Sequence, residues 1–132
     1  MASLEELRVE RIRKLTLLKE AGMSAYPART EAGIRVAEAL TNFETWSTEA
    51  KIITLAGRVL SLRGQGALIF CDLNDGTGKV QALLKTDTLG EGPLTLFNDT
   101  VDLGDFIEVT GTLFTTKRGE QTIEVSTWLM LT

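Results

Sequence analysis

From Lys51 to the end of the chain, apolar residues alternate with polar ones, and this pattern constrains the fold more than any other feature. A period of two places successive side chains on opposite faces of a β-strand. Glycine interrupts two of these runs, at Gly57 and Gly111, where a small barrel needs a bend or a bulge. The second half of the chain is therefore predicted to form short strands that curve around one core.

The alternating runs divide into five strands, which we expect at about residues 52–62, 67–73, 79–84, 105–116 and 121–131. Residues 74–78 (Asn-Asp-Gly-Thr-Gly) predict a hairpin turn between the second and third strands. Residues 93–100 are less strand-like and favour a short helix or an ordered loop. Five strands with one such connection after the third are typical of the OB-fold, a five-stranded Greek-key barrel. An immunoglobulin-like sandwich needs more strands, and an SH3-like barrel leaves the segment 84–104 unexplained.

The residues before the barrel have a helical pattern. Ser3 and Glu6 form a capping box, and leucines recur at intervals of three and four, so an amphipathic helix is expected over residues 3–21. A linker at 23–33 and a short helix at about 36–43 follow. We therefore divide the chain into a helical extension with linker, 1–50, and a barrel, 51–132, and expect a mainly β fold with an N-terminal α part. The basic residues of the first helix form either a solvated face or an approach to RNA phosphates.

Composition excludes several functions for these 132 residues. There is no histidine and only one cysteine, Cys71, which argues against histidine acid–base chemistry and most zinc sites. No glycine-rich phosphate loop is present. We expect no catalytic residue, no metal and no cofactor in this domain, so the chain is not a complete enzyme. The sequence has no apolar run of membrane length, we expect no signal peptide, and the single thiol suits the cytoplasm.

The net charge of −4 argues against a protein that clamps phosphates without regard to sequence. It leaves open the reading of a few unpaired bases by stacking and hydrogen bonding. In the second strand, Asp72 should avoid the barrel interior, and Phe70 shares its face. An exposed Phe70 can stack on a base for roughly 1–3 kcal/mol. Gln81 of the third strand is expected beside it. The alternatives are a core position for Phe70 and an ordinary surface position for Gln81.

OB-folds bind ligands over strands two and three, between the loop that joins strands one and two and the loop that joins strands four and five. The first loop contains Arg63, whose planar fork of donors suits a base carbonyl or a phosphate. The second contains Glu120, which repels phosphate and makes sense in such a site only as an acceptor for a base N–H. Alternatively, Glu120 is a solvated turn charge and Arg63 pairs with a surface acid.

These residues resemble the anticodon-binding barrel of class II aspartyl-, asparaginyl- and lysyl-tRNA synthetases. The shared pattern consists of Gly57-Arg58, Arg63, Phe70, Asp72-Leu73, Asp75, Gly78 and Gln81. Three features are similar to the lysyl branch: a helix that ends in Gly22 before Tyr26-Pro27, Leu103-Gly104-Asp105, and residues 114–120 as Phe-x-Thr-Lys-x-Gly-Glu.

The resemblance implies the N-terminal, anticodon-binding domain of a bacterial-type lysine–tRNA ligase, which contacts the anticodon loop of lysine tRNA. Phe70 would stack on the middle uridine, and Arg63, Gln81 and Glu120 would make its polar contacts. The parent enzyme would be a cytoplasmic homodimer, and ATP and Mg would be needed only by a catalytic domain absent from these residues. Two other hypotheses remain: a free-standing OB module for single-stranded nucleic acid, and a structural or dimerisation module.

Overall fold

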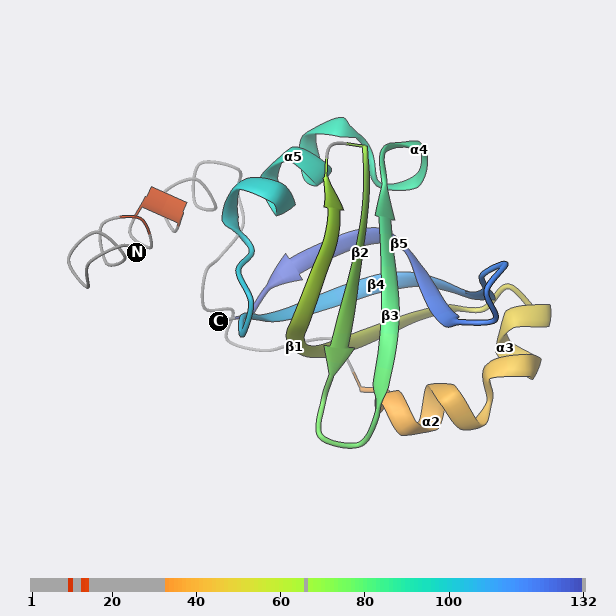
Figure 1. Ribbon diagram of the computed structural model, residues 1–132. Helices are drawn as coiled ribbons and strands as arrows, with labels where there is room; N and C mark the ends of the chain where they lie inside the picture. The colour runs from red at the N-terminus through yellow and green to blue at the C-terminus, as the bar shows by residue number, and fades with distance from the viewer. Residues whose placement is uncertain (1–9, 11–12, 15–32, 66, 132) are drawn as a thin grey trace.

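The computed structural model describes residue 10 and residues 13–14, 33–65 and 67–131 (Figure 1). The predicted helix over residues 3–21 and the linker over 23–33 therefore lie outside the described residues, except for Glu10, Arg13 and Lys14, which are helical, and Gly33. Among the described residues, no helix has the length and apolar character needed to cross a membrane.

Five strands form a closed barrel, in the spatial order β1-β2-β3-β5-β4. Their bounds are β1 Ile52–Gln65, β2 Leu68–Asn74, β3 Lys79–Lys85, β4 Phe106–Thr115 and β5 Gln121–Met130. All neighbours pair antiparallel except β3 and β5, which pair parallel. The OB-fold predicted from the alternation is confirmed.

Inward-facing side chains of the strands fill the barrel, as strand parity predicts. On β2 these are Ile69, Cys71 and Leu73, and on β3 they are Val80, Ala82 and Leu84. Each of these six side chains is buried. The apolar face of the alternating pattern is therefore the core of the barrel, and the other face is left to form a surface.

Helices close the two ends of the barrel (Figure 1). At one end lie α4 (Thr86–Leu89) and α5 (Glu91–Thr100), where Phe97 packs edge-on against Trp128 of β5 with ring centroids 5.2 Å apart. At the other lie α2 (Val36–Thr41) and α3 (Phe43–Thr48), which bury Val36, Ala39 and Phe43 in the same core. Helices α2 and α3 thus pack directly on the barrel.

Three boundaries differ from those predicted. The helix expected to end near residue 43 continues as α3 to Thr48, and the helical connection after β3 begins at Thr86 rather than at 93. Strand β1 extends to Gln65, because its pairing with β2 continues to Gln65 opposite Leu68. Arg63 therefore lies in a strand and not in the loop where we had placed it.

The two mid-strand glycines serve different purposes. At Gly111, the pairing of β4 with β5 shifts register, and a Cβ would lie 1.9 Å from the carbonyl oxygen of Glu124. The predicted bulge is therefore present, and it brings the strands too close for any side chain. At Gly57 the register is regular, and a Cβ would lie 3.2 Å from the backbone of Asn74. Gly57 permits close approach, whereas the bulge of β1 falls between Val59 and Ser61.

Candidate nucleic-acid interface

A row of polar side chains crosses the outer face of the barrel, with one residue on each of four adjacent strands. Ser61 of β1 lies opposite Asp72 of β2, Asp72 opposite Gln81 of β3, and Gln81 opposite Thr122 of β5. Because opposite residues in a sheet point to the same side, the four side chains can reach one another. We call this set the polar row.

Hydrogen bonds join the members of the polar row in two pairs. The Ser61 hydroxyl donates to Asp72 Oδ2 at 2.8 Å, and Gln81 Nε2 donates to Thr122 Oγ1 at 3.0 Å. Thr122 in turn donates to the backbone carbonyl of Glu120 at 3.2 Å. Thr122 is fully buried and Gln81 is only 6% exposed. Gln81 faces outward as predicted, but it is a buried, hydrogen-bonded residue rather than an exposed one.

Arg63 connects the two halves of the polar row. Its Nη1 lies 2.8 Å from Ser61 Oγ and 3.1 Å from Asp72 Oδ2, and its Nη2 lies 2.7 Å from Gln81 Oε1. Burial acts to raise the pKa of Asp72, but the hydrogen bonds from Arg63 and Ser61 outweigh it and hold that pKa below its usual value. Asp72 is therefore a carboxylate at neutral pH, and the guanidinium is fixed by charge-assisted hydrogen bonds.

A second row lies beside the first and includes the aromatic ring. Phe70 of β2 pairs with Arg63 of β1 on one side and with Leu83 of β3 on the other. Phe70 is half-buried, so one part of its ring stays open to a ligand, as parity predicted. Leu83 also faces outward but is buried, so it supports the surface rather than forming part of the exposed site.

The turn between β4 and β5 forms the far wall of the site. Gly119 adopts a φ of +84°, which favours glycine. Thr116 holds the turn from both sides: its N–H donates to the Glu120 carbonyl at 3.0 Å, and its hydroxyl accepts the Glu120 N–H at 3.1 Å. These contacts present the exposed side chains of Lys117, Arg118 and Glu120 above the barrel surface.

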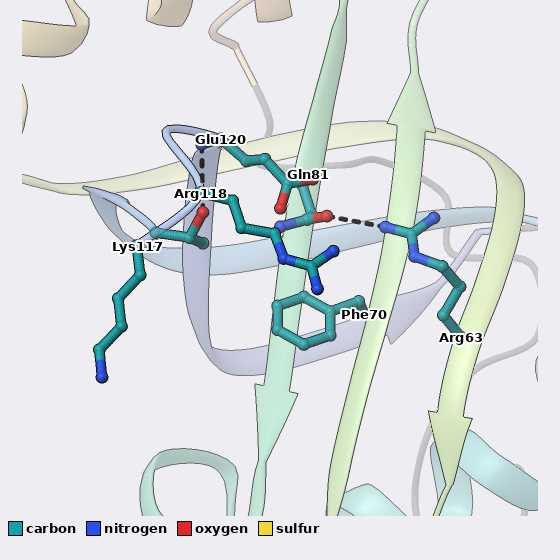
Figure 2. Close-up of a pocket in the computed structure, with 7 residues that line it drawn as sticks. Arg63, Phe70, Gln81, Lys117, Arg118 and Glu120 are labelled. Atoms are coloured by element: carbon teal, nitrogen blue, oxygen red, sulfur yellow. Dashed lines mark hydrogen bonds between the residues drawn. The ribbon is translucent and has the colours of Figure 1, made fainter.

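Together these elements form a pocket of about 440 Å³, shown in Figure 2. Its lining consists of Arg63, Phe70, Gln81, Thr116, Lys117, Arg118 and Glu120. In Figure 2 the polar side chains lie above the ring of Phe70 and on either side of it. All four residues predicted for the site, Arg63, Phe70, Gln81 and Glu120, therefore lie around one hollow, although Glu120 is far from the other three in sequence.

The charges of the pocket are unevenly satisfied. Arg63 is bound to Asp72, whereas the Glu120 carboxylate has no hydrogen-bond or ion-pair partner within the described ranges. A pocket with an aromatic ring, several N–H donors and one unpaired carboxylate can stack a planar base and can accept a base N–H as well as donate to a base carbonyl. In the part of the chain that the structure describes, no group of histidine, cysteine and acidic residues is arranged to hold a metal ion.

Sequence reasoning missed the residues beneath the pocket. Ser61, Asp72 and Thr122 hold the predicted side chains in place but were not selected, and Thr116 and Arg118 line the wall. Asp72 carried a usable signal, since a carboxylate on the outer face beside Phe70 needs a partner. Ser61 and Thr122 carried none, because their positions follow from pairing between distant strands.

A closed five-stranded barrel, with its pocket over β2 and β3 between Arg63 near the end of β1 and the β4–β5 turn, defines the chain as an OB-fold module. Comparison with known proteins agrees: the family model for the OB-fold nucleic acid binding domain, of the tRNA anticodon type, matches residues 53–131. The chain belongs to this family.

Curated relatives match almost the whole chain. A lysine–tRNA ligase of Clostridium perfringens is 40% identical over 129 residues, and lysine–tRNA ligase 2 of Methanosarcina acetivorans is 36% identical over 122 residues. These matches cover 97% and 92% of the chain but 25% and 24% of the two relatives. A lysylphosphatidylglycerol biosynthesis bifunctional protein of Mycolicibacterium gilvum is 37% identical over 127 residues, which is 96% of the chain and 11% of that protein. The chain thus spans about a quarter of the length of the ligases that it matches.

Proposed function

We propose that this chain is the anticodon-binding domain of a lysine–tRNA ligase and that the pocket receives the middle base of the uridine-rich lysine anticodon. The observation that carries the proposal is that Arg63, Phe70, Gln81 and Glu120 line one pocket. The match to the tRNA anticodon-type OB-fold family and the identity to two lysine–tRNA ligases support it.

The pocket suits uridine by its donors and acceptors. Uracil presents one ring N–H between two carbonyl groups. The open part of the Phe70 ring provides a stacking surface for the base, and the unpaired Glu120 carboxylate provides an acceptor for the ring N–H. Cytosine has a lone pair at the same ring position, which a carboxylate repels. Glu120 therefore distinguishes uridine from cytidine in this proposal, whereas Phe70 contributes affinity for either base.

Few phosphates should be neutralised on binding. The chain carries 18 acidic and 14 basic residues. Among the basic side chains that line the pocket, Arg63 is paired with Asp72, which leaves Lys117 and Arg118 for phosphates. Because the dependence of affinity on salt scales with the number of phosphates neutralised, we expect a shallow salt dependence.

The rest of the function lies beyond this domain. Aminoacylation, with its requirement for ATP and Mg, would belong to the remaining three-quarters of a parent enzyme, and this domain alone would charge no tRNA. A homodimeric parent in the cytoplasm is part of the same proposal. A comparison of aminoacylation by this chain and by its parent protein, with lysine tRNA as substrate, tests this division.

Binding to short RNA hairpins tests the main proposal. A labelled stem-loop with a lysine anticodon should bind more tightly than the same loop with cytidine at the middle position, across a range of salt concentrations. Phe70→Ala should weaken binding to both loops by about 1–3 kcal/mol, whereas Glu120→Ala should mainly remove the preference. Asp87→Asn, an exposed change of one charge on α4 away from the pocket, is the control and should bind like the wild type.

Three outcomes would contradict the proposal or part of it. Equal binding of the wild type to both loops would indicate a general single-strand module. If this chain binds neither loop, and a parent protein with its pocket residues substituted still distinguishes the two loops, only a structural role remains. Discrimination that survives Glu120→Ala would show that the carboxylate does not read the base.

A further inference from the structure

We propose that Asp72 is a positioning residue, which holds Arg63 away from Glu120 and so keeps the Glu120 carboxylate available to a base. The inference rests on the proposed function, since it explains how the same pocket stays open before RNA binds. It concerns a residue that does not line the pocket and would touch no ligand.

The contacts of Arg63 all point toward the polar row. Nη1 is shared between Ser61 and Asp72, and Nη2 lies 2.7 Å from Gln81 and 3.5 Å from Asp72 Oδ1. The guanidinium thus uses both terminal nitrogens on neighbours in the barrel wall. This arrangement leaves its Nε–H and its planar face for a ligand and directs its strongest donors away from the opposite wall of the pocket.

A competing acceptor lies within the same pocket. Hydrogen bonding to Asp72 is the main cause of the raised pKa of Arg63, and the charge of Glu120 adds a smaller contribution in the same direction. The Arg63 side chain is 46% exposed and is long enough to reorient. Two carboxylates therefore compete for one guanidinium, and in this structure Asp72 holds it.

Arg63 pairs with Asp72 rather than with Glu120 because the Asp72 carboxylate is already held in position. Its side chain is only 20% exposed, and the Ser61 hydroxyl fixes one of its oxygens at 2.8 Å. Glu120 is exposed on a turn, so an ion pair there is screened by water and has to immobilise two long side chains. A less exposed and already oriented carboxylate makes the stronger partner.

Loss of the Asp72 charge would reverse this preference. Asparagine is a weaker acceptor for a guanidinium, and Glu120 would then be the one carboxylate left among the side chains around the pocket. An Arg63–Glu120 pair would occupy the acceptor that reads the base N–H. It would also take the Arg63 donor from Gln81 Oε1, so that the Gln81 amide would lose one of the two bonds that orient it.

The free protein tests the contact without RNA. We would record the arginine guanidinium NMR signals of the wild type, Asp72→Asn, Glu120→Gln and the double variant. In the wild-type background, Glu120→Gln should shift the Arg63 signal only slightly, because Arg63 is hydrogen-bonded to Asp72 and Glu120 acts on it through its charge alone. In the Asp72→Asn background, the same substitution should shift the signal much more, because Arg63 would then be paired with Glu120. If Glu120→Gln changes the Arg63 signal no more in the Asp72→Asn background than in the wild type, the inference is wrong.

RNA binding tests the consequence. Asp72→Asn should reduce the preference for the middle uridine about tenfold or more, since an interaction with a charged group is lost, and should change the affinity for the cytidine loop much less. The pair Ser61→Asp/Asp72→Ser moves the carboxylate one strand across the polar row, still beside Arg63, and should restore the preference. A purely structural role predicts no such rescue. Thermal unfolding of each variant, with Asp87→Asn as the matched control, identifies any variant that is simply unfolded.

The two proposals fail in different ways. If the wild type discriminates and Asp72→Asn discriminates equally well, the positioning role is wrong and the proposed function stands. If the wild type does not discriminate between the loops, the proposed function is wrong, and the NMR comparison still decides whether Asp72 keeps Arg63 from Glu120.

Discussion

Thr122 should contribute to stability far more than its small side chain suggests. It is fully buried, and its hydroxyl oxygen accepts the Gln81 Nε2–H at 3.0 Å. Thr122→Val keeps the shape of the side chain and removes this acceptor. Gln81 is only 6% exposed, so water cannot easily replace the lost partner, and a buried donor would be left unsatisfied.

The size of the effect can be worked out from these contacts. An unsatisfied buried donor costs about 1–3 kcal/mol. The added methyl group returns up to about 0.8 kcal/mol of apolar burial, and the exposed Glu120, whose carbonyl also loses a bond, can turn to water. We therefore expect a net loss of about 1–2 kcal/mol in the free energy of unfolding. For a domain of this size that corresponds to a fall in Tm of about 3–10 °C.

Unfolding in guanidinium chloride, followed by tryptophan fluorescence, measures the change in the free energy of unfolding. The control is Thr127→Val, which makes the same chemical change at an exposed position of the same strand. This control should alter stability by less than about 0.5 kcal/mol. If Thr122→Val is as stable as Thr127→Val, the Gln81–Thr122 hydrogen bond does not stabilise the polar row, and the reasoning from burial is wrong.

Three further predictions concern the barrel. Gly111→Ala should lower the free energy of unfolding by more than about 3 kcal/mol, because the new Cβ would meet backbone atoms. Gly119→Ala has open space and is opposed only by its positive φ, so it should cost about 1–2 kcal/mol. Equal losses for the two variants in denaturant unfolding would contradict this. Burial raises the pKa of Cys71 to about 12, so iodoacetamide should label it only as fast as the protein unfolds, and rapid labelling of the native protein would refute this. Burial works against a low pKa for Asp75, but hydrogen bonds that include the backbone N–H of Val36 lower it; the stabilisation is therefore present above about pH 4 and lost on acidification, and Asp75→Asn should flatten a plot of stability against pH in that range.

The barrel was predictable because its signal is local and repeated. Each strand alternates between the core and the surface, and glycine marks the bulge of β4, so neither depends on knowing the partner strand. Helix α3 was missed because threonine and serine in Phe43–Thr48 give it weak intrinsic propensity. It forms because Phe43 is buried in the core and Trp46 packs against it, with Lys51 stacked 4.6 Å from the Trp46 ring centre. Tertiary packing, which the local sequence does not reveal, decides that element.

In the site, too, some residues could be placed from local sequence and others could not. Phe70 and Gln81 could be placed because β2 and β3 form a hairpin, and parity within it follows from a short turn. Counting by twos from the inward Val59 instead places Ser61 and Arg63 inside the barrel. The bulge between Val59 and Ser61 reverses that parity and turns both side chains to the outer face, opposite Asp72 and Phe70. A single extra residue thus brings Arg63 to the pocket, because Leu60 has no partner on β2 and Arg63 therefore lies opposite Phe70. Deletion of Leu60 should remove the bulge but keep Ser61 opposite Asp72, so Arg63 should stay on the outer face and RNA binding should be retained; loss of binding would refute this account of the register.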